Sequence, residues 1–444
     1  MAQRTPLMPP LLHMTRLRSA SRPILRLIAA LTGGFALLLL TGCSKLHQVF
    51  SLSGPQSTMV TAGPVASRQW DLFMVTVWVC TFIFIVVGSV LAYAQIKFRA
   101  KTEADEHAAP PAEAGHGNPF VEIGLIAGSV ILLVFIAIPT VRDIWYTHDV
   151  PEDEKAGAIE VTATGYQWWF KFDYPSELVK LPNGGEAPLS TGNELVVPAN
   201  TAVRVQLRTV DVIHSFWIPK LAGKVDMMPN RGNFLWFKAD KPGYYYGQCA
   251  EYCGESHAIM KFRVIALSAA DYIKWLDNQK LSARTVTAQS LAADAAITHV
   301  RFASLKDTGP NSTLAGSPDF DADPFAAWKK MQDHDAGENA ALITAGRKNF
   351  SDKTCITCHT VRGHEGIGIA GPELTHVGAR SSIAAGVLEN TPERLHQWIK
   401  DPAYFKPGNK MYHGGYIDVA TGQPKFTLSD SEIDTLVAYL HSLK

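Results

Sequence analysis

The sequence predicts a multidomain membrane protein with a two-helix transmembrane hairpin, a β-sandwich and a C-terminal all-α domain. Three observations support this fold class. Two long apolar runs lie within residues 65–145, alternating apolar and polar residues recur through 158–267, and helical periodicity marks the C-terminus. A length of 444 residues is enough for two or three domains.

Charge and composition restrict the functional classes. Lysine plus arginine and aspartate plus glutamate both number 41, so the net charge is zero and no nucleic acid partner is indicated. Charged residues make up 18% of the chain, below the roughly 25% of soluble domains. This deficit favours membrane segments. The six cysteines each fit a separate role, so no disulfide framework is required.

Residues 1–42 have the features of a lipoprotein-type signal peptide. Arginines precede an apolar run over residues 27–40, and the Leu-Thr-Gly-Cys sequence that ends at Cys43 resembles a bacterial lipobox. This pattern predicts cleavage before Cys43 and attachment of diacylglycerol to its sulfur. The alternative is an uncleaved membrane segment with a cysteine there by chance.

The two apolar runs predict a transmembrane hairpin within residues 65–145, with spans at about 72–96 and 121–141. At a rise of about 1.5 Å per residue, runs of this length cross the roughly 30 Å hydrocarbon core of a bilayer. The basic residues Lys97 and Arg99 follow the first span and place the connecting loop inside the cell. Both Cys43 and the domains after the second span then lie outside, as lipidation requires.

Residues 158–267 predict a small β-sandwich, because short alternating segments such as 203–207 are separated by glycine and proline turns. A short helix is expected at 269–279. The rest of residues 268–340 is rich in alanine, serine, threonine and proline, which predicts a linker.

A soft donor set suited to copper lies near the end of the β-region. Cys249, Cys253, His257 and Met260 supply two thiolates, an imidazole and a thioether within one short run. A shared thiolate pair bridges two coppers and delocalises an electron over both, which suits electron transfer. His214 is the candidate for a second imidazole. A disulfide or a structural zinc is the alternative for the cysteine pair alone.

Residues 341–444 carry the CxxCH pattern of covalent c-type haem attachment, formed by Cys355, Cys358 and His359. Both thiols add to the haem vinyl groups, and the histidine lies under the iron. A redox or zinc fragment is the alternative for the pattern alone. Met411 is the only methionine after His359, and a methionine sixth ligand would raise the haem potential. The rival axial ligands are His364, His376, His396 and His413.

An amphipathic helix is expected at the C-terminus. Ser429 and Glu432 have the spacing of a capping box. The apolar face that follows consists of Ile433, Leu436, Val437 and Leu440.

Together these motifs resemble subunit II of haem–copper cytochrome c oxidase with a C-terminal fused class I cytochrome c. The hairpin, the segment 213–219 and the run 248–260 carry the resemblance over residues 65–270. The CxxCH pattern carries it over 340–444. The resemblance implies a cupredoxin-like β-domain and an all-α cytochrome c domain.

The resemblance also implies a dinuclear copper (CuA) centre bridged by both cysteines. In the family, the carboxylate of the acid at Glu251 reaches a magnesium ion at the interface with subunit I. The implied copper ligands are His214, Cys249, Cys253, His257, Met260 and the backbone carbonyl of Glu251.

Three further residues match family positions. Trp168 matches the tryptophan that receives electrons from cytochrome c above the copper, although its aromatic run also fits an ordinary buried strand. Glu122 matches an acid near the inner end of the second helix that feeds protons to subunit I; a plain interfacial residue is the alternative. Pro372 matches the proline whose carbonyl accepts the ring N–H of the haem histidine.

The implied function is that of the electron-entry subunit of a proton-translocating terminal oxidase. Electrons pass from cytochrome c through the covalent haem c and CuA to subunit I, where oxygen is reduced to water. Subunit I, and also subunit III, are the expected protein partners. The expected location is the bacterial inner membrane, as a multi-pass protein with the copper and haem domains in the periplasm.

Three alternative functions share part of this pattern. A quinol oxidase subunit would lack the copper ligands, which are all present. A catalytic copper reductase such as nitrous oxide reductase would need a large histidine-rich domain. A membrane-anchored haem and copper carrier to another acceptor would need only one lipid or one helix as an anchor.

Overall fold

The computed structural model describes residues 54–106, 118–181, 184–290, 322–335 and 337–444. The predicted signal peptide, Cys43 and much of the predicted linker lie outside these residues. The chain divides into two compact units at Gly54, and the structure discussed below belongs to the unit Pro55–Lys444.

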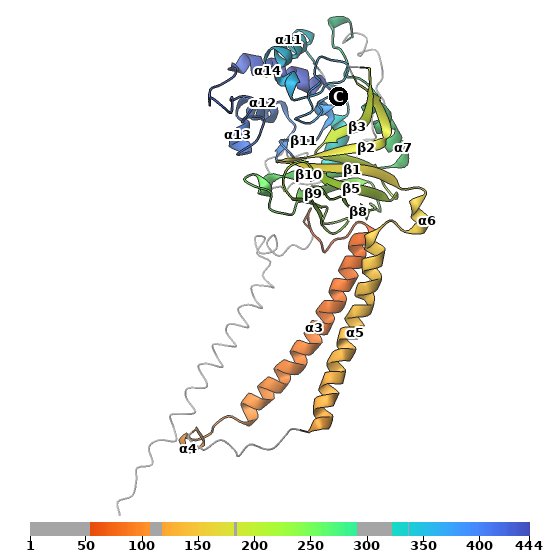
Figure 1. Ribbon diagram of the computed structural model, residues 1–444, viewed down its shortest axis with the longest axis vertical. Coiled ribbons are helices and arrows are strands. Elements are labelled where there is room, and N and C mark those ends of the chain that lie inside the picture. The colour runs from red at the N-terminus through yellow and green to blue at the C-terminus, as the bar shows by residue number, and fades with distance from the viewer. Residues whose placement is uncertain (1–53, 107–117, 182–183, 291–321, 336) are drawn as a thin grey trace, which may run out of the picture. The chain divides into compact units, whose positions relative to one another are not determined.

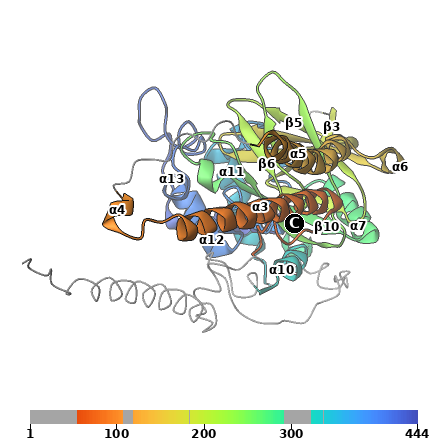
Figure 2. The same ribbon diagram turned by 90° about the horizontal axis from the view of Figure 1, so that it is seen from below.

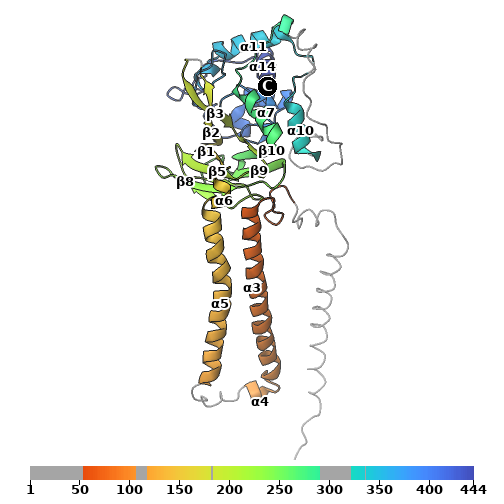
Figure 3. The same cartoon turned by 90° about the vertical axis from the view of Figure 1, so that its right-hand side faces the viewer.

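Two helices form the predicted hairpin, α3 (Pro64–Lys97) and α5 (Pro119–His148). Both are long and apolar enough to cross a membrane, and most of their apolar side chains are exposed. Proline in the first turn suits each helix start, where its missing N–H would have no partner. Figures 1 and 3 show the two helices running side by side. The short helices α4 (Glu103–Glu106) and α6 (Glu152–Lys155) flank them.

The hairpin is attached to the β-domain through side chains near its outer end. Arg68 of α3 pairs with the buried Asp143 of α5, with 3.3 Å between Nη1 and Oδ1. The Arg68 guanidinium also lies 4.2 Å from the centre of the Tyr146 ring. The Trp236 indole N–H donates to the Tyr146 carbonyl oxygen at 3.1 Å. These contacts hold the apolar helices against the domain that carries the site.

The β-sandwich prediction is confirmed by two five-stranded sheets, with the orders β3-β2-β1-β5-β8 and β4-β10-β9-β6-β7. Strands β1 and β5 pair in parallel, as do β4 and β10. The strands are β1 (Ile159–Tyr166), β2 (Trp169–Lys180), β3 (Glu186–Gly192), β4 (Glu194–Pro198), β5 (Val203–Thr209), β6 (His214–Trp217), β7 (Val225–Met227), β8 (Asn233–Phe237), β9 (Gly243–Cys249) and β10 (Lys261–Leu267).

Aromatic side chains fill the space between the two sheets. The Phe216 and Phe262 rings stack with centroids 4.7 Å apart, and Phe170 meets Phe262 edge-on at 4.8 Å. All three are fully buried. Truncation of such a side chain costs about 3–5 kcal/mol. This buried core supports the strand ends and loops that carry the predicted metal ligands.

The C-terminal domain is built on two crossed helices, α11 (Ala340–Asp352) and α14 (Asp430–Ser442). They approach closely because Gly346 has no side chain; a Cβ there would lie 1.9 Å from the Thr435 carbonyl oxygen. The predicted capping box of Ser429 and Glu432 is present. The remaining elements are η2 (Cys355–Thr357), η3 (Val377–Ala379), β11 (Ser382–Ile383), β12 (Leu388–Glu389), α12 (Pro392–Lys400) and α13 (Pro402–Phe405).

The described ends of the predicted linker are packed helices. Helix α7 (Ala269–Lys280) contains the expected segment 269–279 and begins with a Ser268 cap. Helix α10 (Pro324–Met331) lies beyond the undescribed segment and buries Trp328 against the β-domain core. Figure 2 shows both helices. The linker composition therefore did not predict helix α10, whereas the helix at 269–279 was expected.

Candidate metal centre and haem-attachment site

The copper-type residues come from two neighbouring strands and the loop between β9 and β10. His214 begins β6, Cys249 ends β9, and Cys253 and Met260 lie in the following loop around η1 (His257–Ile259). Strands β6 and β9 are adjacent, with Phe216 opposite Cys249. The fold therefore brings a histidine from a distant part of the sequence to the cysteine loop.

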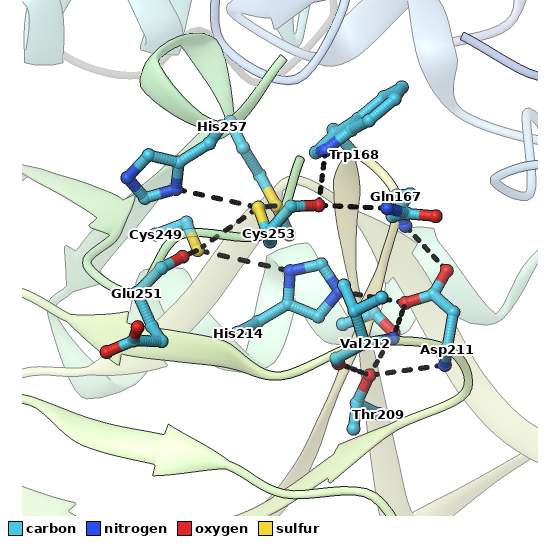
Figure 4. Close-up of polar contacts among 12 residues, drawn as sticks. Gln167, Trp168, Thr209, Asp211, Val212, His214, Cys249, Glu251, Cys253 and His257 are labelled. Carbon is cyan, nitrogen blue, oxygen red and sulfur yellow. Dashed lines mark hydrogen bonds and ion pairs between the residues drawn. The ribbon is translucent and has the colours of Figure 1, made fainter. Parts of the chain in front are cut away.

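The structure brings all six predicted ligands together, as Figure 4 shows for five of them. The Cys249 and Cys253 sulfurs lie 3.7 Å apart. From Cys249 Sγ, His214 Nδ1 lies at 3.9 Å and the Glu251 carbonyl oxygen at 3.2 Å. From Cys253 Sγ, His257 Nδ1 lies at 3.5 Å and Met260 Sδ at 3.8 Å.

These distances fit a pair of thiolates that share metal ions. A disulfide would place the sulfurs about 2.05 Å apart, so the separation of 3.7 Å excludes one. With metal–thiolate bonds of about 2.3 Å, two sulfurs on one metal can be at most about 4.6 Å apart. A structural zinc takes four ligands, and six donors point into this cluster. The donor set therefore fits two soft ions better than one zinc.

The two cysteines share one proton, and only Cys249 loses its own proton readily. A proton shared between the two sulfurs lowers the pKa of Cys249 to about 3 and raises the pKa of Cys253. Both thiols are buried, and neither is oxidised to a disulfide. Metal binding replaces that shared proton, because thiolates are the form that binds metal.

Asp211 orients the His214 imidazole. Its Oδ1 accepts from His214 Nε2 at 2.9 Å, which leaves Nδ1 facing the sulfurs. Burial would raise the pKa of Asp211, but the hydrogen bonds from His214 and from the Gln167 and Val212 amides lower it to about 2. The sequence analysis missed this residue. Its signal was an acid three positions before a candidate ligand.

Trp168, the predicted electron-entry residue, is buried directly beside the cluster. Its indole N–H donates to the Cys253 carbonyl oxygen at 2.9 Å, and the side chain is only 7% exposed. The covering residue is Gly408 of the C-terminal domain, where a Cβ would lie 2.8 Å from Trp168 Cη2. The side chain of Glu122, by contrast, is exposed in the first turn of α5.

The CxxCH residues lie in a turn that presents the histidine ring. Cys355 is the first residue of η2, Cys358 comes directly after its last residue, and His359 follows. Its Nδ1–H donates to the Pro372 carbonyl oxygen at 2.8 Å, the contact that the family resemblance implied. A Cβ at Gly371 would lie 2.5 Å from the His359 ring, so only glycine fits there. Burial lowers the pKa of His359, which favours the neutral imidazole needed for iron.

Met411 lies half-buried in the loop after α13. Three of its rivals have one ring nitrogen in contact with another group: His364 with the Tyr439 hydroxyl at 2.8 Å, His376 with the Leu281 carbonyl oxygen at 3.2 Å, and His396 with Asp434 at 3.5 Å. The second nitrogen of each ring is not used in these contacts. His413 lies in the same loop as Met411, beside the Tyr412 ring.

A membrane hairpin, a β-domain with a thiolate–imidazole cluster and a CxxCH domain define a membrane-anchored electron-transfer protein. The family "cytochrome c oxidase subunit II, periplasmic domain" matches residues 159–267, and the cytochrome c family matches 343–444. Cytochrome c oxidase subunit 2 of Alkalihalophilus pseudofirmus is 31% identical over 92% of this chain and 95% of that protein. The chain therefore belongs to the cytochrome c oxidase subunit 2 family, and is a subunit of a haem–copper oxidase.

The chain is also similar to a second subunit 2 and to a solved periplasmic domain. The subunit 2 of Bacillus subtilis is 29% identical over 92% of this chain and 95% of that protein. The solved periplasmic domain of subunit II of cytochrome oxidase from Bradyrhizobium japonicum is 34% identical and covers 28% of this chain and 93% of that structure, with a TM-score of 0.24.

Proposed function

We propose that this subunit passes electrons from a donor such as cytochrome c through a covalent haem c and a dinuclear CuA centre to subunit I. There, oxygen is reduced to water with proton translocation. The observation that carries the proposal is the cluster of six donors, in which both sulfurs lie within 4 Å of each other and of an imidazole. A shared thiolate pair suits electron transfer because little geometry changes when an electron arrives.

Each residue has a defined part in this proposal. Two coppers would supply the delocalised electron acceptor, held by the donor set above. Cys355 and Cys358 would attach the haem, and His359 and Met411 would hold its iron. The Pro372 carbonyl orients His359, as Asp211 orients His214. The backbone carbonyl oxygen of Glu251 contacts the Cys249 sulfur, whereas its carboxylate points away from the sulfurs (Figure 4). The carboxylate would face a magnesium ion bound with subunit I.

The same proposal includes the membrane arrangement. It places the chain in the bacterial inner membrane as a multi-pass protein, with the copper and haem domains in the periplasm; two described helices are long and apolar enough to cross a membrane. Lys97 and Arg99 at the inner end of the first span support this orientation. Subunit I and subunit III are the proposed neighbours of the hairpin. Glu122, at the inner start of α5, is the proposed proton-entry residue.

The test is a cofactor and subunit analysis of the complex purified through this chain. We expect two coppers and one covalent haem for each chain, measured by metal analysis and by the pyridine haemochrome spectrum. An electron paramagnetic resonance signal shared equally by two coppers should accompany them. One copper for each chain, or a localised signal, would contradict the CuA assignment. Absence of a large haem-containing membrane subunit would favour the membrane-anchored carrier.

Replacement of Asp211 by asparagine is expected to weaken copper binding by about 10–100-fold, because the hydrogen bond that fixes the His214 ring loses its charge. The copper hyperfine spectrum should shift, since the imidazole loses electron density. Copper affinity is measured by competition with a chelator. Asp240→Asn, at an exposed turn of the same domain, is the control and should bind copper as the wild type does. Equal affinities in the two variants would show that Asp211 does not position the ligand.

A further inference from the structure

Glu194 is a buried acid at the start of β4, and its carboxylate is hydrogen-bonded to residues outside the β-domain. Its Oε1 accepts from the Ser381 amide at 2.6 Å and from the Ser381 hydroxyl. Its Oε2 accepts from the Trp328 indole N–H at 3.1 Å. Ser381 belongs to the cytochrome c domain and Trp328 to α10. All three donors therefore come from segments that follow the β-domain with the predicted copper ligands (residues 159–267, here called the copper domain) in the sequence.

We propose that Glu194 fixes the register in which the cytochrome c domain docks on the copper domain. A buried carboxylate contributes little net stability, because its desolvation offsets its hydrogen bonds. It penalises wrong arrangements strongly, since any slip of the partner surface leaves it buried without donors. A carboxylate that takes two of its three hydrogen bonds from Ser381 of the docking domain therefore selects one docked arrangement.

Further contacts at the same interface extend this register along β10. The Lys261 amide donates to the Ala385 carbonyl oxygen at 3.0 Å, as in a strand pair. The Arg263 guanidinium donates to the Gly386 carbonyl oxygen at 2.9 Å. The Tyr244 hydroxyl lies 2.8 Å from the Ser381 hydroxyl. Several contacts around Glu194 therefore join the two domains.

The docked register places the loop before Met411 over the copper cluster. The Ser256 hydroxyl donates to the Pro407 carbonyl oxygen at 2.6 Å, and Gly408 covers Trp168. Lys410 Nζ lies 3.6 Å from Asp211 Oδ2, and Asp211 holds His214. The residue next to the proposed haem ligand therefore pairs with the residue that orients a proposed copper ligand.

Two consequences follow, and both rest on the proposed function. Haem-to-copper transfer takes place in one fixed arrangement and needs no search by a tethered domain. An external donor delivers its electron to the cytochrome c domain, because that domain's Gly408 covers Trp168. Glu194 is thus a positioning residue: it is not one of the proposed metal or haem ligands, and it acts by fixing how the cytochrome c domain docks.

The test uses the purified complex and two readouts. The first is hydrogen exchange at the Lys261 and Ser381 amides, which donate across the interface to Ala385 and Glu194; this readout needs no cofactor. The second is copper reduction after light-triggered reduction of the haem. In the wild type we expect protected amides and a single-exponential transfer that solvent viscosity does not change. In Glu194→Ala we expect loss of that protection, and a fast phase whose amplitude falls to roughly a tenth as the docked population falls.

Two further variants keep the proposal open to refutation. Ser381→Ala removes one donor and leaves the carboxylate, so it should show a smaller effect in the same direction. Glu186→Ala, at an exposed position of β3, is the matched control and should behave as the wild type. Wild-type transfer that slows in proportion to viscosity, or unchanged exchange in Glu194→Ala, would overturn the proposal. Missing copper or haem spectra in the wild type would instead refute the proposed function alone.

Discussion

Replacing Cys249 with serine is expected to abolish the shared copper signal and reduce bound copper from two ions to fewer than one for each chain. Cys249 Sγ is the centre of the cluster, with contacts to Cys253, His214 and the Glu251 carbonyl oxygen. Serine supplies a harder and much less acidic oxygen in place of a thiolate that bridges both metals. The measurement is copper content with the electron paramagnetic resonance spectrum of the purified complex.

The matched control is Met260→Leu, which removes a donor from the same cluster at nearly the same volume. Met260 contacts only Cys253 among the predicted ligands, at 3.8 Å, and a thioether is a weak ligand. We expect this variant to keep two coppers, with a shifted spectrum. Full copper loss in Met260→Leu together with two coppers in Cys249→Ser would reverse the roles assigned here.

Replacing Met411 with alanine is expected to lower the haem potential by at least about 59 mV, a tenfold change in equilibrium constant for one electron. Loss of the thioether removes the ligand that favours reduced iron. The haem should stay attached, because Cys355 and Cys358 are untouched. The copper spectrum should stay that of the wild type, because Met411 is not among the predicted copper ligands. Redox titration measures the haem potential, and electron paramagnetic resonance checks the copper spectrum.

His413→Ala is the comparison that identifies the axial ligand. His413 lies in the same loop and is the rival whose ring has no hydrogen-bond partner among the described contacts of the haem domain. We expect it to leave the haem spectrum and potential unchanged. If His413→Ala lowers the potential and Met411→Ala does not, histidine is the sixth ligand.

The ligand-bearing motifs were predictable from the sequence because their residues are close neighbours along the chain. Cys249, Cys253, His257 and Met260 lie in one loop, where spacing alone fixes which side chains can converge. The CxxCH turn and the Ser429 capping box are local in the same way. The apolar runs predicted the hairpin because the length of a membrane span is set by the bilayer.

Contacts between distant segments required the tertiary structure. The family resemblance predicted that His214 lies beside the cysteines. The hydrogen bond between His214 and Asp211, however, depends on how the loop before β6 folds. Trp168 was expected to receive an external donor, and it lies beneath Gly408 of the chain's own cytochrome c domain. No spacing rule links residues so far apart, because their meeting depends on two folded surfaces.

Glu194 shows most clearly the difference between what the sequence predicts and what only the tertiary structure reveals. In the sequence it is one acid at the start of an apolar strand, where an exposed side chain is the ordinary expectation. In the structure it is 4% exposed and accepts hydrogen bonds from residues 134 and 187 positions further along the chain. The sequence by itself predicted which residues would bind copper and haem. The docking of the two domains decided how those sites face each other, because only folded surfaces can supply donors to a buried carboxylate.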